Sequence, residues 1–517
     1  MNPIVGIDLG TTYSALACLD EVGVPHVVPI GSERIVPSCV YVPAGGQEKV
    51  VGEYAKRALP TDARRVLRRF KRLMDHDPTT PVPHGPGLSA TGASSKILSY
   101  LAAEASKQIG PVRDVVITVP ANFADKGRRA TIKAAEDAGL NVKVLINEPT
   151  AAALAFAAQH DVNGKVLVYD LGGGTFDVSI VQVTGKQVDV LTSEGDDHLG
   201  GVDFDEAIGK AINEEHRRQF GETLTRRLGI DDGDELKSND WWEILLECEG
   251  WKKQLSQLNQ VEIRAGFPPN RLTMSLAREV FEDLLGSAVA QTEIRVETAL
   301  DNLQLHHRDI DHILLVGGST RIPAFRQSLK KLFGKTPLES VNADEAVALG
   351  AAIRAGLEAA PERLKPFQRE RLAQMNLTEV TNKSYGTLVL EHDESLREAR
   401  LVNVEMISKD TVIPCRHSRT FFTVVDDQRQ VKCRVTEADV KDETDPAHTN
   451  LRFEGMLGPF PAGRPAGQAI EVNFSYDKSQ VMHVSFTDVS SGKQIEADIS
   501  LGSSKTTNDD IPTFTIE

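Results

Sequence analysis

The chain has few cysteines, and none of them is spaced for a zinc site or a disulfide framework. Its 517 residues include 5 cysteines without a Cys-x-x-Cys pair, so we expect reduced and mostly buried thiols. No run reaches the ~18 apolar residues that are needed to cross a bilayer. The first residues carry neither a basic segment nor a long apolar core, which argues against a signal peptide. We therefore expect a cytoplasmic protein.

Positive charge is also scarce. Lysine and arginine together number 58 against 74 aspartates and glutamates, which gives a formal net charge of −16. Such a composition favours solubility and argues against general binding to nucleic acid or to an anionic membrane, so neither partner is expected. Any phosphate group must then be bound by backbone dipoles and a few placed cations.

Several common signatures of nucleotide and hydrolase chemistry are missing. The chain has no Gly-x-x-x-x-Gly-Lys-Ser/Thr and no Gly-x-Gly-x-x-Gly, so neither P-loop nor Rossmann chemistry is indicated. No Ser–His–Asp set can be assembled from local motifs, and the 13 histidines show no metal-ligand spacing.

One motif, by contrast, occurs twice. An apolar strand runs into residues 7–12 (IDLGTT), and a second runs into residues 170–177 (DLGGGTFD). Each copy places a carboxylate, Asp8 or Asp170, at a strand end before a turn of glycines and hydroxyls. Glycine lets backbone N–H groups approach an anion closely, and the carboxylates suit a magnesium ion held through waters. One copy alone is also an ordinary strand-to-turn signal, but the repeat predicts two facing hairpins that grip a metal–polyphosphate.

A third glycine turn and one long helix are candidate nucleoside contacts. In residues 316–323 (VGGSTRIP) a buried strand opens through two glycines into a helix, and Arg321 can stack on an aromatic base. The helix expected at 239–257 has a core-facing stripe of Trp241, Leu245, Cys248 and Leu255. Its second face carries Glu249, Lys252, Lys253 and Ser256. That face is either a solvated row of ion pairs or an adenosine-binding edge.

The order of strands and helices predicts two α/β lobes around a central cleft, lobe I at about 1–160 and lobe II at about 161–360. In lobe I we expect strands at 4–7, 14–19, 26–30, 38–42 and 114–119, helical spacing over 64–73, a loop at 79–93, and helices at 94–108, 125–138 and 148–159. In lobe II we expect strands at 166–169, 177–183, 187–193 and 313–316, and helices at 203–228, 239–257, 276–303, 322–333 and 344–358.

The pattern changes after about residue 360. Residues 361–380 are charged and predict a linker or a frayed helix. Residues 381–501 predict short alternating strands of an all-β sandwich, and 502–517 predict a flexible tail. The strands are expected at 385–391, 401–406, 419–425, 430–436, 469–476, 481–487 and 494–500.

The chain resembles the DnaK-type heat-shock chaperones, within the actin-like (ribonuclease H-like) ATPases, collinearly over residues 1–358 and more weakly through Ile413-Pro414 and His417-Ser418. The matching segments are 6–14 (GIDLGTTYS), 118–123 (TVPANF), 146–153 (INEPTAAA), 169–177 (YDLGGGTFD), 199–201 (LGG), 315–321 (LVGGSTR) and 344–346 (DEA). The resemblance implies a two-lobed ATPase domain over 1–360, followed by a β-sandwich peptide-binding domain.

The resemblance also implies roles for individual residues. Lys71 would hold the attacking water and offset γ-phosphate charge, with Glu148, Asp170 and Thr175 as its catalytic partners. The carboxylates that arrange magnesium waters would be Asp8, Glu148, Asp170 and Asp177. ATP or ADP would be bound by Asp8, Gly10, Thr11, Thr12, Tyr13, Gly172, Gly173, Gly174, Gly200, Gly201, Glu249, Lys252, Lys253, Ser256, Gly317, Gly318, Ser319, Arg321 and Asp344. Pro120 and Arg128 would report the nucleotide state to the neighbouring domain, and K⁺ is a further cation that the resemblance suggests.

Five departures from the family pattern stand out. The small β-rich subdomain that usually follows Lys71 is reduced to the loop around 79–93, which puts the usual nucleotide-exchange factor in doubt. Val202 replaces a glutamate, and Lys253 replaces an arginine or apolar residue. The linker segment 372–380 is more polar than usual, and no helical lid follows the β domain, so bound peptide should leave faster.

The peptide cleft is the least specified part of the chain. By position, its apolar wall would be Leu390, Phe421, Val424, Val431 and Cys433. The same residues could simply fill the core of a sandwich, and Thr387 stands where a large apolar residue is usual.

Three hypotheses for function follow. The first is an ATP-dependent chaperone that binds unfolded or extended apolar clients, with a J-domain-type co-chaperone and an exchange factor as further partners. The second is a nucleotide-dependent interaction switch that binds one folded partner. The third is a small-molecule kinase on the same fold, which would need a substrate hydroxyl in the cleft.

Overall fold

A computed structural model describes residues 3–46, 49–75, 80–82, 86–230, 238–266, 268–339, 342–393, 398–497 and 514–515. The chain forms two compact units. The first unit consists of Met1–Phe123 and Ala130–Leu377, and the second of Ala124–Arg129 and Thr378–Glu517. Parts of the expected loop at 79–93, and the expected tail at 502–517 apart from 514–515, lie outside the described residues.

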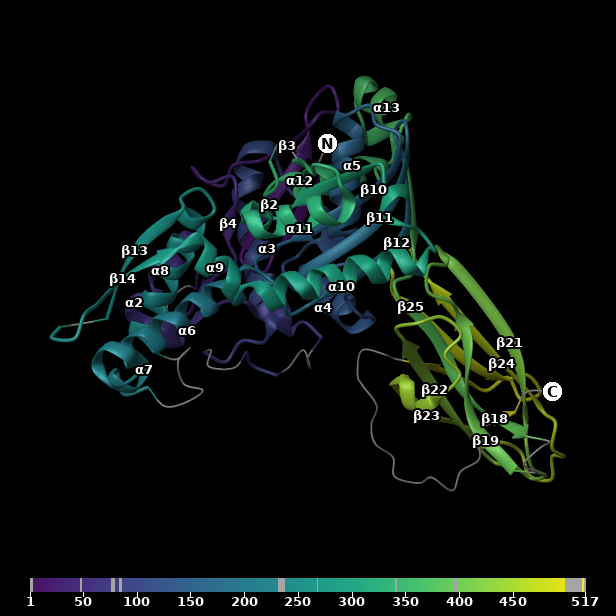
Figure 1. Ribbon diagram of the computed structural model, residues 1–517. Coiled ribbons are helices and arrows are strands. Elements are labelled where there is room, and N and C mark those ends of the chain that lie inside the picture. The colour runs from purple at the N-terminus through teal and green to yellow at the C-terminus, as the bar shows by residue number, and fades with distance from the viewer. Residues whose placement is uncertain are drawn as a thin grey trace. The chain divides into compact units, whose positions relative to one another are not determined.

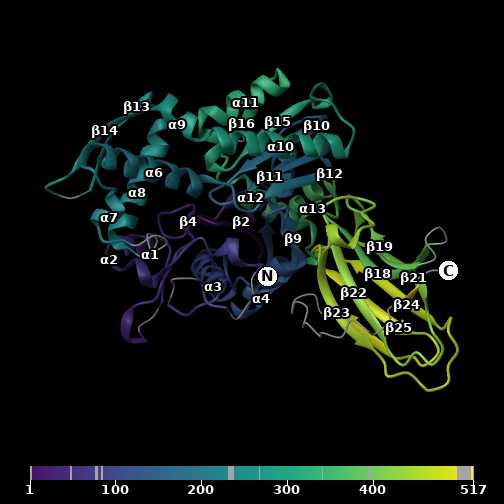
Figure 2. The same cartoon turned by 60° about the horizontal axis from the view of Figure 1, so that its bottom comes forward.

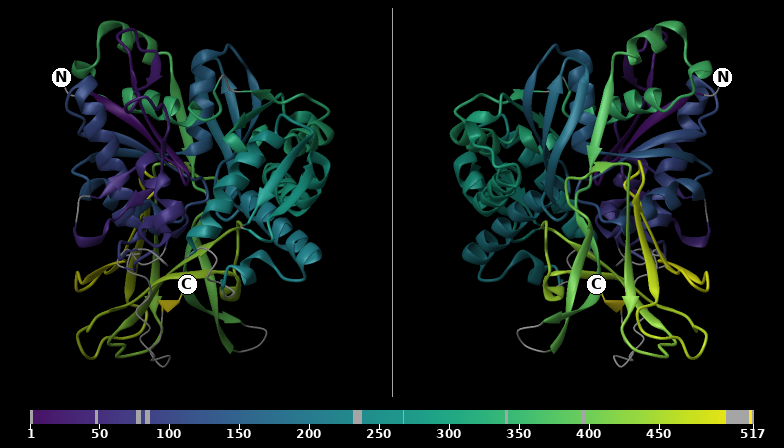
Figure 3. Two further views of the ribbon diagram at one scale, coloured as in Figure 1. Left: turned by 90° about the vertical axis from the view of Figure 1, so that its left-hand side faces the viewer. Right: turned by 90° about the vertical axis from the view of Figure 1, so that its right-hand side faces the viewer.

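The first unit contains two larger sheets that are built to the same plan. The sheet of lobe I has the order β3-β2-β1-β8-β9, with β4 paired to β2. The sheet of lobe II contains β16-β15-β10-β11-β12 in that order. The bounds are β1 (Ile4–Leu9), β2 (Tyr13–Leu19), β3 (Pro25–Val27), β4 (Val36–Pro37), β8 (Asp114–Val119), β9 (Asn141–Asn147), β10 (Gly164–Leu171), β11 (Phe176–Thr184), β12 (Gln187–Asp196), β15 (His312–Val316) and β16 (Leu338–Glu339). Figure 3 shows the two lobes side by side, in purple to blue and in teal.

Corresponding strands of the two sheets carry the repeated motif. β1 forms an antiparallel hairpin with β2 and lies parallel to β8. In the same way β10 forms a hairpin with β11 and lies parallel to β15 (Figure 2). Asp8 faces Ala15 across the first hairpin, and Asp170 faces Asp177 across the second. Both aspartates therefore lie at the carboxyl end of a central strand, where open α/β sheets bind ligands.

The helices of the first unit cover the faces of these sheets. They are α3 (Ala90–Ile109), α5 (Glu148–Gln159), α6 (Gly201–Phe220), α7 (Leu224–Arg227), α8 (Asn239–Leu255), α9 (Arg278–Leu284), α10 (Gly286–Asn302), α11 (Pro323–Phe333) and α12 (Ala346–Leu357). A further helix, α4 (Asp125–Asp137), begins in Ala124–Arg129 and continues into the first unit. The core-facing stripe expected on α8 is buried as predicted.

Helices α5 and α12 pack closely against each other (Figure 1). Residues 148–158 of α5 are all buried, which accounts for its many alanines. A side chain at Gly350 of α12 would overlap the backbone of Ala151, and one at Gly6 of β1 would overlap the backbone of Ala351. Small residues on these elements therefore allow the backbones to approach closely.

Some elements differ from the sequence-based expectations. The helical spacing over 64–73 does not produce an α-helix: Arg69 adopts a left-handed backbone with φ 56°, and only the short 3₁₀ segments Ala63–Arg65 and Phe70–Leu73 are helical. Val66–Leu67 instead forms β7, which pairs with β5 (Val40–Tyr41) in a small sheet that also holds β6 (Val50–Val51). Beside this sheet lie α1 (Glu53–Arg57) and α2 (Leu59–Asp62). Strand β9 and the hairpin of β13 (Gln260–Ala265) with β14 (Leu272–Ala277) were not predicted.

The expected linker contains regular structure. Pro361–Arg363 is a short 3₁₀ turn, Pro366–Leu372 is helix α13, and Asn376–Val380 is strand β17. β17 crosses the boundary between the two units and pairs antiparallel with β20 (Val412–Ile413) through Glu379 and Val380.

The second unit consists mainly of strands, as the sequence predicted. β18 (Ser384–Asp393), β19 (Glu398–Ile407), β22 (Val431–Ala438) and β23 (Asn450–Leu457) form one group of paired strands. β21 (Cys415–Thr423), β24 (Ala469–Tyr476), β25 (Met482–Asp488) and β26 (Gln494–Ala497) form another. A short strand, β27 (Phe514–Thr515), pairs with β18 and with β21. Strand β23 was not predicted.

The close approach of α12 to α5 is testable with two glycines that both lie inside helices. A methyl group at Gly350 would overlap the Ala151 backbone, whereas one at Gly250 of α8 meets nothing within 4 Å. We expect Gly350→Ala to destabilise the first unit by about 1–3 kcal/mol or more. Gly250→Ala should be neutral or stabilise it by up to about 1 kcal/mol. Thermal unfolding of both variants checks this, and equal melting temperatures would contradict the proposed packing.

Candidate nucleotide-binding site

The turns of the two repeated hairpins contact each other. A side chain on Gly173 would overlap Thr12, and one on Gly174 would overlap Thr11. Because only glycine has room at these two positions, the hydroxyl turn of lobe I and the glycine turn of lobe II can close on the same space. Asp8 and Asp170 consequently line one cavity rather than two separate surfaces.

Four carboxylates and one lysine gather beneath these turns. Glu148, Asp170 and Asp177 are buried and Asp8 is partly buried. Lys71, only 3% exposed, forms an ion pair with Glu148. Thr118 donates a hydrogen bond of 2.9 Å to Asp8, and the backbone N–H of Asn122 donates one of 3.3 Å to Asp177.

The negative charges of these buried carboxylates repel one another unless protons or a cation neutralise them. Burial, together with the nearby Glu148 charge, raises the pKa of Asp8 to about 7, although Lys71 works in the opposite direction. Burial and the charge of Glu148 also raise the pKa values of Asp170 and Asp177 well above their ordinary value. A group of carboxylates that prefers to hold protons in this way is stabilised by an incoming cation.

The cluster fits a magnesium ion that keeps its water shell. The Oδ2 atom of Asp177 is buried without a hydrogen-bond partner, so it can accept a bond from a metal-bound water. Over the described ranges, no three His, Cys, Asp or Glu side chains are placed to hold a metal directly. Oxygen ligands reached through waters suit Mg²⁺, which loses its hydration shell reluctantly.

Two adjoining cavities extend from this cluster. The inner one, of about 90 Å³, is lined by Asp8, Gly10, Thr11, Thr12, Tyr13, Glu148, Asp170, Gly172, Gly173, Thr175, Gly317, Gly318 and Asp344, among others. The outer one, of about 840 Å³, shares Thr11, Thr12, Tyr13, Gly173, Gly318 and Asp344 with it and adds Gly201, Glu249, Lys252, Lys253, Ser256, Ser319 and Arg321. The cavities therefore form one path from the carboxylates to the polar face of α8.

The polar face of α8 carries a network of ion pairs. Glu249 forms an ion pair of 2.8 Å with Lys56 and one of 2.7 Å with Lys253, and Tyr13 donates a hydrogen bond of 3.1 Å to it. Although burial works against it, the charges of Lys56 and Lys253 lower the pKa of Glu249 to about 2. Glu249 is therefore ionised, and it joins lobe II to Lys56 and Tyr13 of lobe I.

Lys252 and Arg321 are already paired with carboxylates. Lys252 is buried, donates to the carbonyl of Gly201 at 2.7 Å and forms an ion pair of 2.7 Å with Asp205. Arg321 is half exposed and forms an ion pair of 2.8 Å with Asp344 at the cavity wall. Arg321 therefore has room to stack on a ring, whereas Lys252 also supports the Gly201 turn.

Comparison with known proteins identifies the family. The family model described as Hsp70 protein matches residues 4–85 and 79–515. The chain belongs to the Hsp70 family. It is 37% identical to the Chaperone protein DnaK of Thermotoga neapolitana and 36% identical to that of Thermotoga petrophila. Each match spans 98% of this chain and 82% of the relative.

Two further residues, Arg72 and Asp203, also shape this site, although no sequence motif pointed to them. Arg72 donates to the carbonyl of Gly174 at 2.7 Å and binds both carboxylate oxygens of Asp203, at 3.0 and 2.6 Å. Asp203 also accepts a hydrogen bond of 2.8 Å from the backbone N–H of Gly200. Arg72 thus ties together the turns that hold Gly174 and Gly200, a role hidden in a basic run of the sequence.

The other predicted site residues have structural positions of their own. Gly174 and Gly200 lie against each other, since a side chain on Gly200 would overlap the backbone of Gly174. Val202, which stands where the family usually has a glutamate, is buried. Pro120 is buried at the end of β8 in the first unit, and Arg128 is buried within the segment Ala124–Arg129 of the second.

The predicted peptide-cleft residues divide into two groups. Phe421, Val431 and Cys433 are fully buried in the core of the second unit, the alternative that the sequence left open. Leu390 and Val424 are only partly buried. Thr387, which stands where a large apolar residue is usual in the family, is buried, and its hydroxyl donates to the carbonyl of Arg434 at 2.7 Å.

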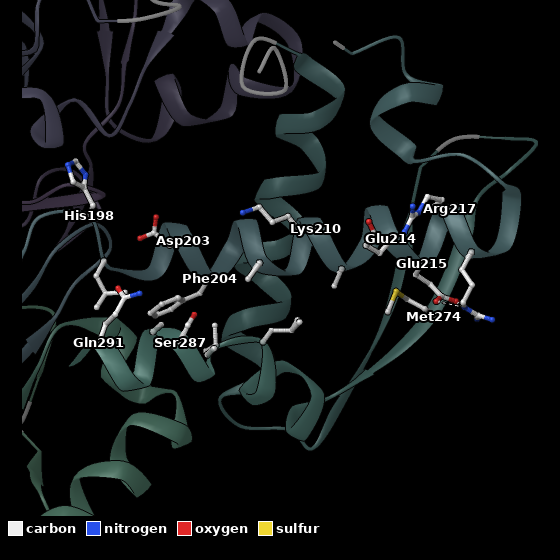
Figure 4. Close-up of a pocket in the computed structure, with 17 residues that line it drawn as sticks. His198, Asp203, Phe204, Lys210, Glu214, Glu215, Arg217, Met274, Ser287 and Gln291 are labelled. Atoms are coloured by element: carbon white, nitrogen blue, oxygen red, sulfur yellow. Dashed lines mark hydrogen bonds and ion pairs between the residues drawn. The ribbon is translucent and has the colours of Figure 1, made fainter. Parts of the chain in front are cut away.

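A wider hollow of about 1140 Å³ lies elsewhere on lobe II (Figure 4). Its lining comes from α6, β14, α9 and α10 and includes Phe204, Lys210 and Met274. It shares no residue with the predicted nucleotide site.

Among the described residues, no helix is both long and apolar enough to cross a membrane.

The raised carboxyl pKa values predict proton release on binding. The folded pKa of Asp8 is raised from about 4 to about 7, so the protonated form stabilises the empty fold and this contribution is lost as pH rises through that window. Bound Mg²⁺ favours the ionised form, so Mg–ADP binding should release more protons near pH 6 than near pH 8. Calorimetry in two buffers of different ionisation enthalpy measures this. Asp8→Asn should release fewer protons, and equal release at both pH values would contradict the assignment.

The role of Arg72 is testable with a charge-preserving change. Lysine lacks the planar fork by which three nitrogens of Arg72 reach the two oxygens of Asp203 and the Gly174 carbonyl, so we expect Arg72→Lys to weaken ADP binding by about tenfold. Arg65→Lys is the matched control, because Arg65 makes only a 3.7 Å ion pair with Asp62 in the same segment. Titration with a fluorescent ADP analogue measures both, and unchanged affinity in Arg72→Lys would contradict the clamp.

Proposed function

We propose that this Hsp70 protein is an ATP-dependent chaperone of the DnaK type. In this proposal the first unit hydrolyses ATP to ADP and phosphate, and the second binds extended apolar segments of client polypeptides. The observation that carries the proposal is the single path from the Lys71–Glu148 pair, past two facing glycine turns, to the polar face of α8. Such a path has the polarity order that suits a nucleoside triphosphate: metal and phosphate at one end, sugar and base at the other.

The inner cavity would hold the phosphates. Backbone N–H groups at Gly10 and Gly173 and the hydroxyls of Thr11, Thr12 and Thr175 are suited to phosphate oxygens. The N–H of Gly172, which lines the same cavity, instead donates to the carbonyl of Thr175 at 3.1 Å and so closes the turn. Mg²⁺ would neutralise charge on the β- and γ-phosphates when it is bound. Asp8, Glu148, Asp170 and Asp177 would orient its waters.

Lys71 would act on the attacking water. Its ammonium is buried against Glu148, so it is held rigidly and can offset charge that develops on the γ-phosphate. Phosphoryl transfer depends mainly on positioning and charge neutralisation, and both are supplied by this buried pair.

The outer cavity would hold the nucleoside. Glu249, Lys252 and Ser256 would contact the ribose hydroxyls, and Arg321 would stack on the base beside Gly317, Gly318 and Ser319. The hydroxyl of Ser319 donates to the carbonyl of Gly172 at 2.8 Å, which joins this wall to the phosphate turn. Asp344 would keep Arg321 in place through their ion pair.

Further parts of the proposal rest on family membership. The two relatives carry the chaperone name, and this supports the chaperone over the interaction switch and the small-molecule kinase. A J-domain-type co-chaperone, an exchange factor, K⁺ at the site, coupling through Pro120 and Arg128, and a cytoplasmic location complete the proposal.

The catalytic assignment is tested by ATP turnover. We expect Lys71→Ala and Glu148→Ala each to lower the turnover number by about 10²–10³-fold while ADP still binds. Lys133→Ala is the control, because Lys133 is an exposed lysine of α4 that pairs only with Asp137 one turn away. The unmodified chain should hydrolyse ATP faster when an unfolded polypeptide is added. Full turnover in Lys71→Ala would overturn the mechanism, and unchanged turnover with client would overturn the coupling.

A further inference from the structure

Strand β27 holds an unusual place in the second unit. Without it, the paired strands separate into two four-stranded sheets, one with β18, β19, β22 and β23 and one with β21, β24, β25 and β26. Among the described strands of this unit, β27 is the only one that pairs with both sheets. It appears in Figure 3 as a short arrow at the yellow end of the colour scale.

The pairing is that of a strand inserted between two edges. Thr515 lies opposite Leu390 in a parallel pair with β18. Thr515 and Phe514 lie opposite Phe422 and Thr423 in an antiparallel pair with β21. β18 and β21 therefore both present backbone edges to β27, and edges of this kind bind extended peptides by adding a strand.

The side chain of Phe514 fills an apolar pocket. It is fully buried, and its ring centroid lies 5.0 Å from that of Phe421 and 6.1 Å from that of Phe486. An aromatic side chain buried between two sheets contributes strongly to binding an extended segment. Two residues predicted from sequence for the peptide cleft, Leu390 and Phe421, are thus the ones that meet β27.

Resting on the peptide-binding role proposed above, we propose that Phe514–Thr515 is an intramolecular occupant of the peptide groove between β18 and β21. A client must then displace the chain's own strand. Clients that compete well share its chemistry, a bulky aromatic residue within an extended segment whose backbone can pair on both sides.

The strength of this self-occupation follows from its tether. Phe514 is joined to β26 by residues 498–513 of the same chain. A short tether gives its end an effective concentration of about 1 mM near its binding site. A free peptide of the same sequence must compete with that concentration, so its apparent affinity falls even though the groove is unchanged.

Binding of a free peptide tests the proposal in the full chain. The probe is a fluorescein-labelled peptide with the sequence of residues 510–517 (DIPTFTIE). We expect Phe514→Asp to bind it at least about tenfold more tightly than the unmodified chain does, because the competing strand is weakened. Val489→Asp is the matched control, since it adds the same charge at an exposed apolar residue of the same unit. Equal, measurable affinity in all three proteins would overturn the self-occupation.

A second probe separates this inference from the proposed function. Reduced, carboxymethylated α-lactalbumin stays unfolded and presents many apolar segments. One outcome is that the chain binds this unfolded protein, but neither the unmodified chain nor Phe514→Asp binds the terminal peptide. The self-occupation is then overturned and the chaperone function stands. Binding to neither probe would overturn both.

A measurement on the unmodified chain covers the case in which Phe514→Asp misfolds. The amide of Phe514 or Thr515 that pairs within the sheets should exchange slowly with solvent, and excess unlabelled terminal peptide should speed that exchange. Fast exchange without competitor, or slow exchange that the competitor does not change, would overturn the proposal.

Discussion

The first unit is organised around several carboxylates that lie close together in its interior. Asp8, Asp170 and Asp177 all prefer to hold protons there, and the Lys71–Glu148 pair offsets only part of the negative charge. Such a cluster persists only if the surrounding packing holds it. The close approach of α12 to α5 and to β1, through Gly350 and Gly6, supplies that rigid support. A ligand that brings positive charge relieves the repulsion, which is why the same geometry both strains the empty protein and favours a metal-bound nucleotide.

Contacts between the lobes surround this centre. Lys56 and Tyr13 of lobe I meet Glu249 of lobe II, and Arg72 reaches from lobe I to Gly174 and Asp203. At the outer rim the guanidinium of Arg68 stacks 3.7 Å above the ring of Trp242. Each of these contacts would be broken or remade if the lobes separated. The cleft is therefore closed by ion pairs, hydrogen bonds and a cation–π contact between buried and partly buried side chains of the two lobes.

The second unit is governed by a different constraint, which is that backbone groups at the edges of its two sheets need hydrogen-bond partners. Two sheets pack their apolar faces together, with Phe421, Val431 and Cys433 inside. Their facing edges at β18 and β21 still carry N–H and C=O groups that need partners. Any extended segment with a large apolar side chain can satisfy both requirements, and in this structure Phe514–Thr515 does so. Binding of a client peptide and binding of the chain's own residues 514–515 would thus use the same pair of strand edges.

Much of this could be read from local sequence, and the physical reason is periodicity. Apolar runs before Asp8 and Asp170 indicated buried strands, and the glycines after them indicated turns, so the paired hairpins and most helices of the first unit were predictable. Tertiary structure decided the rest. Val66 and Leu67 joined a small sheet although their spacing was helical, because pairing with Val40 and Tyr41 outweighed local preference. The clamp of Arg72, the ion pair of Lys56 with Glu249 and the insertion of Phe514 join residues far apart in the chain, and a local pattern carries no information about such distant partners.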